Sequence, residues 1–428
     1  MNANKTSVKK SSYDYDIAIV GGGMVGLTLA QLLVSTLTGI RVILIERQPL
    51  PTQTTQPLQP SFDGRATALS ATTVELFEDV GLWSTISQQA TPISRVHISD
   101  RTHIGMCTFS KEENGNRELG YVVNNAWLGQ SLIRGLDRAE CMSLMAPAQV
   151  LQAQPLADGM QLSINDENGK QHIYRVDLMI LADGSKSALA KQLGIEPFQY
   201  DYQQHALVTT VEFEKPHRGV AYERFTDEGP LALLPSGGNT NAKVSALVWT
   251  HPGDRVDATL ALSDSEFLLK LQRRFGYRLG KFIGVGQRAS YPLSLHLARE
   301  QVRSSLVLMG NAAHFLHPVA GQGFNLAVRD CAQLVSTLQA ALSQSQRLGT
   351  LAVLNQYRID RDRDTFLTKE LSHNFNRLFS NKHLPLIIGR NLGLLSLAFL
   401  PKLRRRFFYQ MMGRGYDRAK ISIMQANT

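Results

Sequence analysis

The chain has 428 residues, of which 43% are hydrophobic, and its formal net charge at pH 7 is +9. This length allows a large buried core with two or three structural units, and the composition is that of an ordinary soluble α/β protein. The three cysteines form no CxxC pair and no metal spacing, as expected for reduced thiols in the cytoplasm, and no run of about 18 apolar residues predicts a transmembrane helix.

Residues 1–13 are polar and predict an N-terminal tail. The stretch 15–27 then joins an apolar, β-branched run to a glycine cluster and a helix-forming run, which predicts a strand, a tight turn and a helix. Gly21, Gly23 and Gly26 have the GxGxxG spacing, which permits the turn, the approach of a pyrophosphate and close packing of helix on strand. Phosphates are favoured at such a helix N-terminus.

A second apolar run, residues 41–45, ends at Glu46, twenty positions after Gly26. An acid at the tip of the second strand accepts hydrogen bonds from ribose hydroxyls, and it repels a 2′-phosphate. The motif therefore predicts an adenosine cofactor with a free 2′-hydroxyl, which is either FAD or NAD.

Further candidates follow in chain order. Arg65 stands after a glycine near a helix start, where it either contacts a cofactor or is a solvated or salt-bridged arginine. A predicted helix, residues 126–139, carries Gln130. The buried strand 178–181 ends at Asp183 and Gly184, and strand ends of this kind face the ligand crevice of an α/β sheet. Asp183 is alternatively a helix cap.

Residues 205–250 change character, with short β-rich runs that suggest an antiparallel sheet inserted into the first domain. An amphipathic helix is predicted over 263–275. Within the sheet, Tyr222, Arg224 and Leu233 are candidates for a substrate pocket, although exposed strand positions are an equal interpretation of the first two.

The strand 305–309 returns to the first domain and leads into Gly310, Asn311 and a glycine-rich segment. A helix of about twenty residues is predicted to begin near Gly323, and Gly321 and Gly323 leave N–H groups free at its start. A helix N-terminus aimed at a flavin ring would stabilise negative charge there.

Three motifs now stand together: GxGxxG with Glu46, the Asp183-Gly184 pair, and the segment from Gly310 to Gly323. In order and spacing they resemble the FAD-dependent aromatic hydroxylases, the p-hydroxybenzoate hydroxylase-like monooxygenases. Residues 62–66, 222–226 with 229–235, and 389–391 look like the ubiquinone-biosynthesis branch of that family.

The resemblance implies an α/β fold with a Rossmann-like FAD-binding domain, an inserted antiparallel β-sheet substrate domain and C-terminal helices. The expected boundaries are 14–95, 120–200 and 290–345 for the FAD domain, 96–119 and 201–289 for the sheet, and 346–428 for the helical region.

The resemblance also implies which residues hold FAD. Gly21, Gly23, Gly26 and Glu46 would hold the ADP part, and Arg65 and Gln130 would contact the flavin or its phosphate linker. The others are Asp183 and Gly184 at the crevice, Gly310 and Asn311 at the ribityl chain, and Pro318, Gly321, Gln322, Gly323 and Asn325 at the isoalloxazine ring. The family usually has Asp where this chain has Asn311, which keeps an oxygen acceptor but loses a negative charge.

The implied reaction is hydroxylation of a polyprenyl phenol of the 2-polyprenyl-6-methoxyphenol type in ubiquinone biosynthesis. NADH or NADPH would reduce FAD, O₂ would give a C4a-hydroperoxide, and the phenol ring would attack its distal oxygen. His314, His317 and Pro318 are the catalytic candidates, while packed, hydrogen-bonded histidines are the plainer interpretation. The base that removes the phenol proton is not identified by the sequence.

Between Glu370 and Asp417 the chain has no acidic residue. Apolar runs at 384–388 and 392–400 are followed by the basic run 402–406, which favours an amphipathic helix on the inner, anionic face of a membrane. Packing on the FAD domain or a homo-oligomer interface explains the same pattern.

Two other functions remain open from the sequence. A sibling hydroxylase acting on another ring position or a soluble phenol would have the same motifs. A flavin-binding scaffold, recruiting other ubiquinone-biosynthesis proteins to a membrane, would suit the basic tail, although it would not need the flavin-ring residues. No recognition motif supports nucleic-acid binding.

Overall fold

The computed structural model describes residues 13–50, 65–101, 105–136, 139–226, 228–316, 321–379, 393, 396–397, 399–414 and 419. Side chains are described within these ranges except at 371–379. Several expectations fall outside the described residues: the polar tail up to residue 12, His317 and Pro318, the apolar run 384–388 and the motif 389–391. Two others do so in part, the motif 62–66 at residues 62–64 and the apolar run 392–400 at residues 392, 394, 395 and 398.

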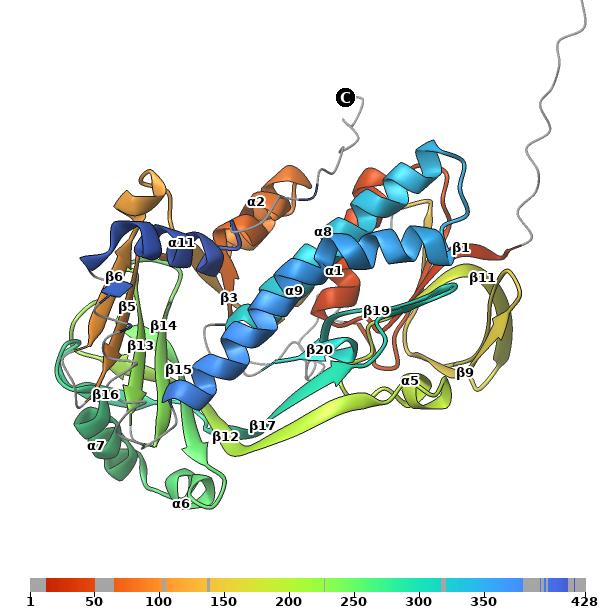
Figure 1. Cartoon of the computed structure of the whole chain (residues 1–428). Coiled ribbons are helices and arrows are strands. Elements are labelled where there is room, and N and C mark those ends of the chain that lie inside the picture. Colours follow the sequence, from red (N-terminus) through yellow and green to blue (C-terminus); the bar gives the residue numbers. More distant parts are fainter. Residues whose placement is uncertain are drawn as a thin grey trace, which may run out of the picture.

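A largely parallel sheet forms the first part of the molecule, with the strand order β18-β19-β11-β1-β2-β8 (Figure 1). Its parallel strands are β1 (Tyr15–Val20), β2 (Val42–Ile45), β8 (Met142–Met145), β11 (Gln171–Leu181) and β19 (Leu306–Leu308). The antiparallel members are β9 (Ala148–Leu156), β10 (Gly159–Asp166) and β18 (Val302–Arg303).

Both faces of this sheet are buried, which explains why its central strands are continuous apolar runs. Ile17 and Ile19 of β1 pack with α1 (Met24–Thr36) and α8 (Gln322–Ser343). Ala18 and Val20 point the other way, into a core shared with β9, β10 and α5 (Ala188–Gln192). The carboxyl ends of β1, β2 and β11 therefore meet at one edge, as the α/β prediction requires.

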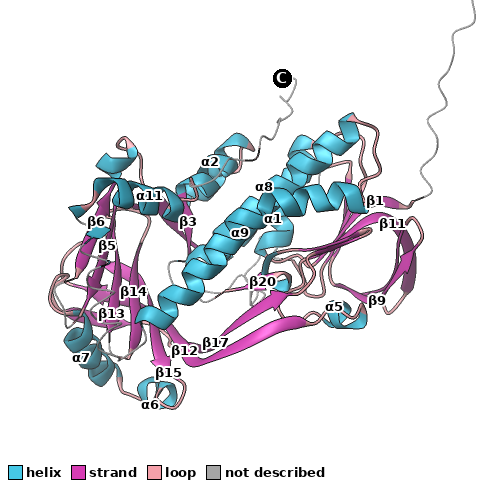
Figure 2. Ribbon diagram, in the orientation of Figure 1, coloured by secondary structure: helices cyan, strands magenta, loops and turns pink. Residues whose placement is uncertain are grey.

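The second sheet has the order β20-β17-β12-β15-β14-β13-β5-β6, with β16 beside β12. Its strands are β5 (Arg95–Asp100), β6 (Met106–Ser110), β12 (Pro197–Phe213), β13 (Val220–Thr226), β14 (Gly229–Ser236), β15 (Val244–Pro252), β16 (Phe282–Val285), β17 (Ala289–Ala298) and β20 (His314–Phe315). Neighbours are antiparallel except β13 and β5. β17 was expected in the first domain, but it pairs with β12 along its whole length, and the two run together toward the first sheet (Figure 2).

One face of the second sheet is covered by α7 (Asp264–Phe275) and α6 (Val256–Leu260). Ser263 and Glu266 form a capping box at the start of α7, and Phe267, Leu271 and Phe275 fill its buried side. The opposite face is left for the cavity described below.

A small sheet lies between the two large ones, in the order β3 (Ala66–Ser70), β7 (Gly120–Asn124), β4 (Thr91–Ile93). Short helices accompany it: α2 (Ala71–Asp79), α3 (Trp83–Ile86) and α4 (Asn125–Ile133), with a single turn at Ser87–Gln89. Two further single turns follow strands of the large sheets, Lys111–Asn114 after β6 and Gly310–Ala312 after β19. The helix α4 ends earlier than the predicted residue 139.

Two long helices are described in the C-terminal part. α9 (Leu351–Phe379) runs along α8, and α11 (Pro401–Met411) lies across the end of the second sheet (Figure 1). Within the described ranges, no helix combines the length and the hydrophobicity needed for a bilayer span.

Candidate functional site

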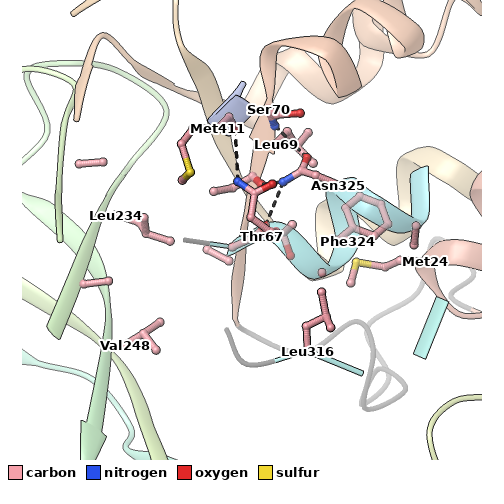
Figure 3. Close-up of a pocket in the computed structure, with 18 of the residues that line it drawn as sticks. Met24, Thr67, Leu69, Ser70, Leu234, Val248, Leu316, Phe324, Asn325 and Met411 are labelled. Atoms are coloured by element: carbon pink, nitrogen blue, oxygen red, sulfur yellow. Dashed lines mark hydrogen bonds between the residues drawn. The ribbon is translucent and has the colours of Figure 1, made fainter. Parts of the chain in front are cut away.

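A cavity of about 600 Å³ lies between the loops of the first sheet and the inner face of the second, a size typical of ligand sites. Five groups of residues make up most of its lining. They are the glycine loop with Glu46 and Asp183, the strand β3, the start of α8, the cavity face of β5, β6 and β13–β15, and the inner side of α11. Figure 3 shows Leu234 and Val248 of the second sheet across the cavity from Phe324 of α8 and Met24 of α1.

The glycine loop has no room for side chains. Gly21 has a φ of +112°, and a Cβ on it would lie 2.5 Å from the carbonyl oxygen of Ala182. A Cβ on Gly26 would lie 1.9 Å from the carbonyl oxygen of Gly21. Gly23 is the N-cap of α1 and makes no side-chain cap, and the first turn carries no acid. The loop thus leaves the positive end of α1 open toward the cavity.

Glu46 lies at the tip of β2, where the sequence predicts it. Its Oε2 accepts a hydrogen bond from Gly22 N at 2.5 Å, and its Oε1 accepts one from Gln48 N at 2.8 Å. These bonds orient the carboxylate at the edge of the cavity, and each oxygen keeps a lone pair for a ribose hydroxyl.

Asp183 and Gly184 follow β11 and line the same edge. The Asp183 side chain is exposed toward the cavity, and partial loss of hydration there raises its pKa to about 6, against the lowering effect of the hydrogen bond from Ser187 Oγ. Ser187, and not Asp183, caps the following helix α5. Asp183 is therefore free for a role at the crevice rather than the capping role.

The start of α8 faces the cavity from the other side. Gly321, in the left-handed conformation with a φ of +58°, is its N-cap without a side-chain bond, and no acid occupies the first turn. A Cβ on Gly323 would meet no atom within 4 Å, so open space lies beside it. Asn311 is exposed and lines the cavity, and Gly310 packs against Val25 too closely for any side chain.

Two uncapped helix N-termini thus open into one cavity, at α1 and at α8. Free N–H groups and the helix dipoles favour negative charge at both points. FAD carries a pyrophosphate and, when reduced, an electron-rich ring, so this pair of sites fits two separate parts of that cofactor.

Asn325 lines the cavity, so its place beside the flavin ring remains a prediction, and its amide has a structural role as well. Its Nδ2 donates to the carbonyl oxygens of Ala68 and Gly321 at 2.8 and 2.9 Å, and its Oδ1 accepts from Ser70 N and Thr73 Oγ1, both at 2.8 Å. Figure 3 shows Asn325 beside Ser70. These four bonds use the whole capacity of the amide. Asn325 therefore ties the start of α8 to β3 and α2.

Other predicted residues lie away from the lining. The guanidinium of Arg65 stacks over the ring of Tyr291, 4.6 Å from its centroid, and Gln130 is exposed on α4. Neither belongs to the described cavity lining, so their contacts with FAD remain predictions.

His314 is only 1% exposed, and its Nε2 lies 2.6 Å from Asp330 Oδ2 on α8. Arg361 Nε donates to the other oxygen of Asp330 at 2.6 Å. Burial by itself raises the pKa of Asp330, but Arg361 and His314 lower it to about 2, so the carboxylate is charged. This buried network joins His314 to α8 and α9, a placement that favours a structural role over catalysis.

Two of the substrate-pocket candidates are corrected by the structure. Leu233 is completely buried in the core under α7, and Arg224 Nε donates to the carbonyl oxygen of Arg274 in α7 at 3.0 Å. Tyr222 touches the cavity, but its ring packs edge-on against Phe275. Successive strand residues point to opposite faces, and α7 covers the face to which these three belong.

The cavity face of β13 and β14 instead carries the alternate residues Ala221, Glu223, Ala232 and Leu234. Sequence reasoning missed Glu223, and it missed the side chains with which α11 closes the cavity: Phe407, Phe408, Met411 and Met412. Their hydrophobic spacing along 407–412 was a signal, but it could not show what the helix covers.

Comparison with known proteins shows to which family the chain is similar. The family model described as "FAD binding domain" matches residues 14–364. Ubiquinone hydroxylase UbiL of Rhodospirillum rubrum is 35% identical over 398 residues, which are 93% of this chain and 89% of that protein. The 3-demethoxyubiquinol 3-hydroxylase of Escherichia coli is 30% identical over 403 residues, 93% of this chain and 98% of that protein.

Solved structures agree on the fold. The p-nitrophenol 4-monooxygenase PnpA from Pseudomonas putida superposes with a TM-score of 0.75 at 17% identity, over 94% of this chain and 99% of that one. Pseudomonas aeruginosa PqsL, in complex with 2-aminobenzoylacetate, gives 0.72 at 18% identity, over 89% and 99%.

Proposed function

This chain belongs to the FAD-binding-domain family of hydroxylases, alongside the ubiquinone hydroxylases, and we propose that it hydroxylates the ring of a polyprenyl phenol in ubiquinone biosynthesis. It is an FAD-dependent monooxygenase, and NADH or NADPH and O₂ are its other reactants. The observation that supports the substrate class is the cavity, because an apolar wall of β-sheet and helix α11 stands opposite the two helix N-termini.

The chemistry that FAD supplies when bound is acceptance of hydride from the nicotinamide and activation of O₂. The residues of this chain hold and shield the reactants. The open N-terminus of α1 and Glu46 would bind the ADP part, and the open N-terminus of α8 would stabilise negative charge on the reduced ring. Leu234, Val248 and Phe408 would exclude water around the substrate ring.

The test is product analysis with the FAD-loaded protein, NADH or NADPH, O₂ and a short-tailed analogue such as 2-farnesyl-6-methoxyphenol. We expect one nicotinamide to be oxidised per hydroxylated product, with the new oxygen derived from labelled O₂. If every polyprenyl phenol yields only hydrogen peroxide, the substrate assignment is wrong even though the protein binds FAD.

The position of the substrate ring that is hydroxylated is a second question, and the relatives and the sequence motifs point to two different positions. The Escherichia coli relative is named for position 3 of a demethoxyubiquinol, whereas the sequence motifs suggested a 2-polyprenyl-6-methoxyphenol. Supplying each ring type separately and locating the new hydroxyl by NMR decides between them, because both would use the same FAD site.

We also propose that α11 brings the cavity to an anionic membrane surface. Its inner side, with Phe408, lines the cavity, and Arg404 is turned inward to Glu113 at 2.7 Å. Its outer side exposes the three cations Lys402, Arg405 and Arg406 and the apolar Leu403, and the exposed Phe399 and Leu400 directly precede the helix. Cations at the headgroups beside buried apolar groups are the pattern of an interfacial helix.

Replacing Lys402, Arg405 and Arg406 with Ala tests this surface. Each cation contributes about 1 kcal/mol to binding at an anionic membrane, so we expect about 100-fold weaker binding for the triple variant. The measurement is co-sedimentation with vesicles of phosphatidylglycerol and phosphatidylethanolamine, compared with phosphatidylcholine alone.

The matched control removes three exposed lysines from other surfaces: Lys170, Lys191 and Lys215. It lowers the net charge equally and is expected to bind as the unmodified protein does. Equal weakening in both triple variants, or no binding to anionic vesicles by the unmodified protein, would contradict a role for α11.

A further inference from the structure

Glu223 is a carboxylate on the apolar wall of the cavity. It lies in the middle of β13, between its cross-strand partners Ala232 on β14 and Ile98 on β5, and both of these also line the cavity. Among the described residues, no hydrogen bond or ion pair to its carboxylate is found. A partly buried carboxylate without a partner weakens a fold, so a ligand is the natural partner for this one.

Strand alternation confines Glu223 to the cavity. Its neighbour Arg224 bonds to α7 on the opposite face, and Tyr222 packs there too. The charged and titratable groups on the surrounding elements are Asp100 of β5, Cys107 of β6, Arg404 of α11 with its partner Glu113, and Glu46 and Asp183 at the cavity edge.

None of these groups shifts the titration of Glu223. Loss of hydration alone raises its pKa to about 7. A carboxylate that titrates near neutral pH is a stronger base than an ordinary one, and half of it is still ionised there. The same cavity contains the start of α8, where the flavin ring is expected.

We propose that Glu223 accepts the proton of the substrate's phenolic hydroxyl while the ring is hydroxylated, an inference that rests on the proposed function. The phenolic O–H bond breaks, its electron pair stays on the oxygen, and the proton forms an O–H bond with the carboxylate. The electron pair enriches the ring as it attacks the electrophilic oxygen, and the proton then passes to solvent. A free phenol is a weaker acid than Glu223, but its acidity rises steeply as the ring gives up electron density.

The experiment compares the FAD-loaded unmodified protein with Glu223→Gln and Glu223→Asp, using 2-farnesyl-6-methoxyphenol as the probe. Glu212→Gln is the control, since Glu212 is an exposed carboxylate of β12 in the same sheet. The readouts are kcat and KM across pH, the ratio of product to hydrogen peroxide, the FAD content and the melting temperature.

We expect kcat of the unmodified protein to rise with pH through about 7. Glu223→Gln should lose this rise and about 100- to 10,000-fold of kcat, with KM changed far less and nicotinamide oxidation diverted to peroxide. Glu223→Asp, which keeps the carboxylate, should recover part of kcat and the pH dependence. Glu212→Gln should match the unmodified protein.

A second readout needs no substrate. Because folding raises the pKa of Glu223 above the ordinary 4.5, its carboxyl favours the folded state below pH 4.5, and this contribution is lost as the pH rises through about 7. The melting temperature of the unmodified protein should therefore fall relative to that of Glu223→Gln over this range. This comparison also shows whether the variant folds.

The outcomes separate the two proposals. If the unmodified protein makes product and Glu223→Gln keeps the same kcat and pH profile, Glu223 is not the base and the proposed function stands. If the unmodified protein hydroxylates no polyprenyl phenol, the proposed function fails, and the role of Glu223 fails with it. If Glu223→Gln loses FAD, its kcat says nothing about the base, and Glu223→Asp decides instead. An FAD-loaded Glu223→Asp variant that recovers none of the kcat would overturn the assignment of Glu223 as the base.

Discussion

The Gly26→Ala variant is expected to be purified without FAD. A Cβ at position 26 would lie 1.9 Å from the carbonyl oxygen of Gly21, and a backbone atom cannot move aside as a flexible side chain can. The glycine loop and the start of α1 must therefore move apart, and the free N–H groups of the helix no longer point toward the pyrophosphate. We expect FAD affinity to fall at least about 100-fold, as for lost contacts of about 3 kcal/mol.

Helix propensity alone predicts the opposite sign, because Ala stabilises a helix interior by about 1 kcal/mol relative to Gly. The control is Gly39→Ala, at a φ of +71° with no atom within 4 Å of its Cβ. That variant has backbone strain without a clash at the site, and it should retain FAD. The measurement is the flavin absorbance of the purified proteins, followed by titration with FAD. A fully yellow Gly26→Ala protein would show that the loop does not hold the cofactor as proposed.

The second large effect is expected for Asp330→Ala. Asp330 is completely buried and accepts from both Arg361 and His314 at 2.6 Å. Removing one partner of a buried ion pair leaves an uncompensated charge and costs about 3 to 5 kcal/mol. Arg361 keeps a second carboxylate partner, Asp364. The stability loss therefore reaches about 5 kcal/mol only if Asp364 does not neutralise the charge of Arg361 in the variant. The free energy of unfolding is measured by chemical denaturation of the FAD-loaded protein.

The control for Asp330 is Asp158→Ala, which breaks an ion pair with Arg175 whose side chains are 50% and 43% exposed. An exposed pair contributes about 0 to 1 kcal/mol, so this variant should be nearly neutral. The pH dependence gives a further check. Folding lowers the pKa of Asp330 from 3.8 to about 2, so its stabilisation is present above pH 3.8 and is lost as the pH falls toward 2. Equal stability of Asp330→Ala and Asp158→Ala would contradict a buried charge network.

Local sequence patterns were sufficient to predict an element where both of its faces have the same environment. The strands β1, β2 and β11 are buried on both faces, so their continuous apolar runs identified them directly. Ser263 and Glu266 marked the start of α7, and the glycines before α8 marked its N-terminus. Boundaries were less certain, as α4 shows: it ends at Ile133, before the predicted residue 139.

The substrate wall could not be predicted in the same way. One face of β13 and β14 packs against α7, and the other face lines the cavity. Apolar residues therefore occur on both faces of these strands. Leu233 and Leu234 are equivalent by composition, and only the strand pairing shows that Leu234 faces the cavity. Asn325 lay in the predicted segment, but its partners on β3 and α2 are about 250 residues away, with separations of 252 to 257 positions.

The sequence by itself determined the cofactor class and the place of its loops, because a glycine turn, an acid at a strand tip and a helix start are set by neighbouring residues. Only the tertiary structure decided which side chains line the cavity. It turned Glu223 toward the cavity, buried His314 beside Asp330, and laid α11 over the open side. The physical reason is that a strand presents two faces and a helix several, and which one meets a ligand depends on segments that are distant in the chain.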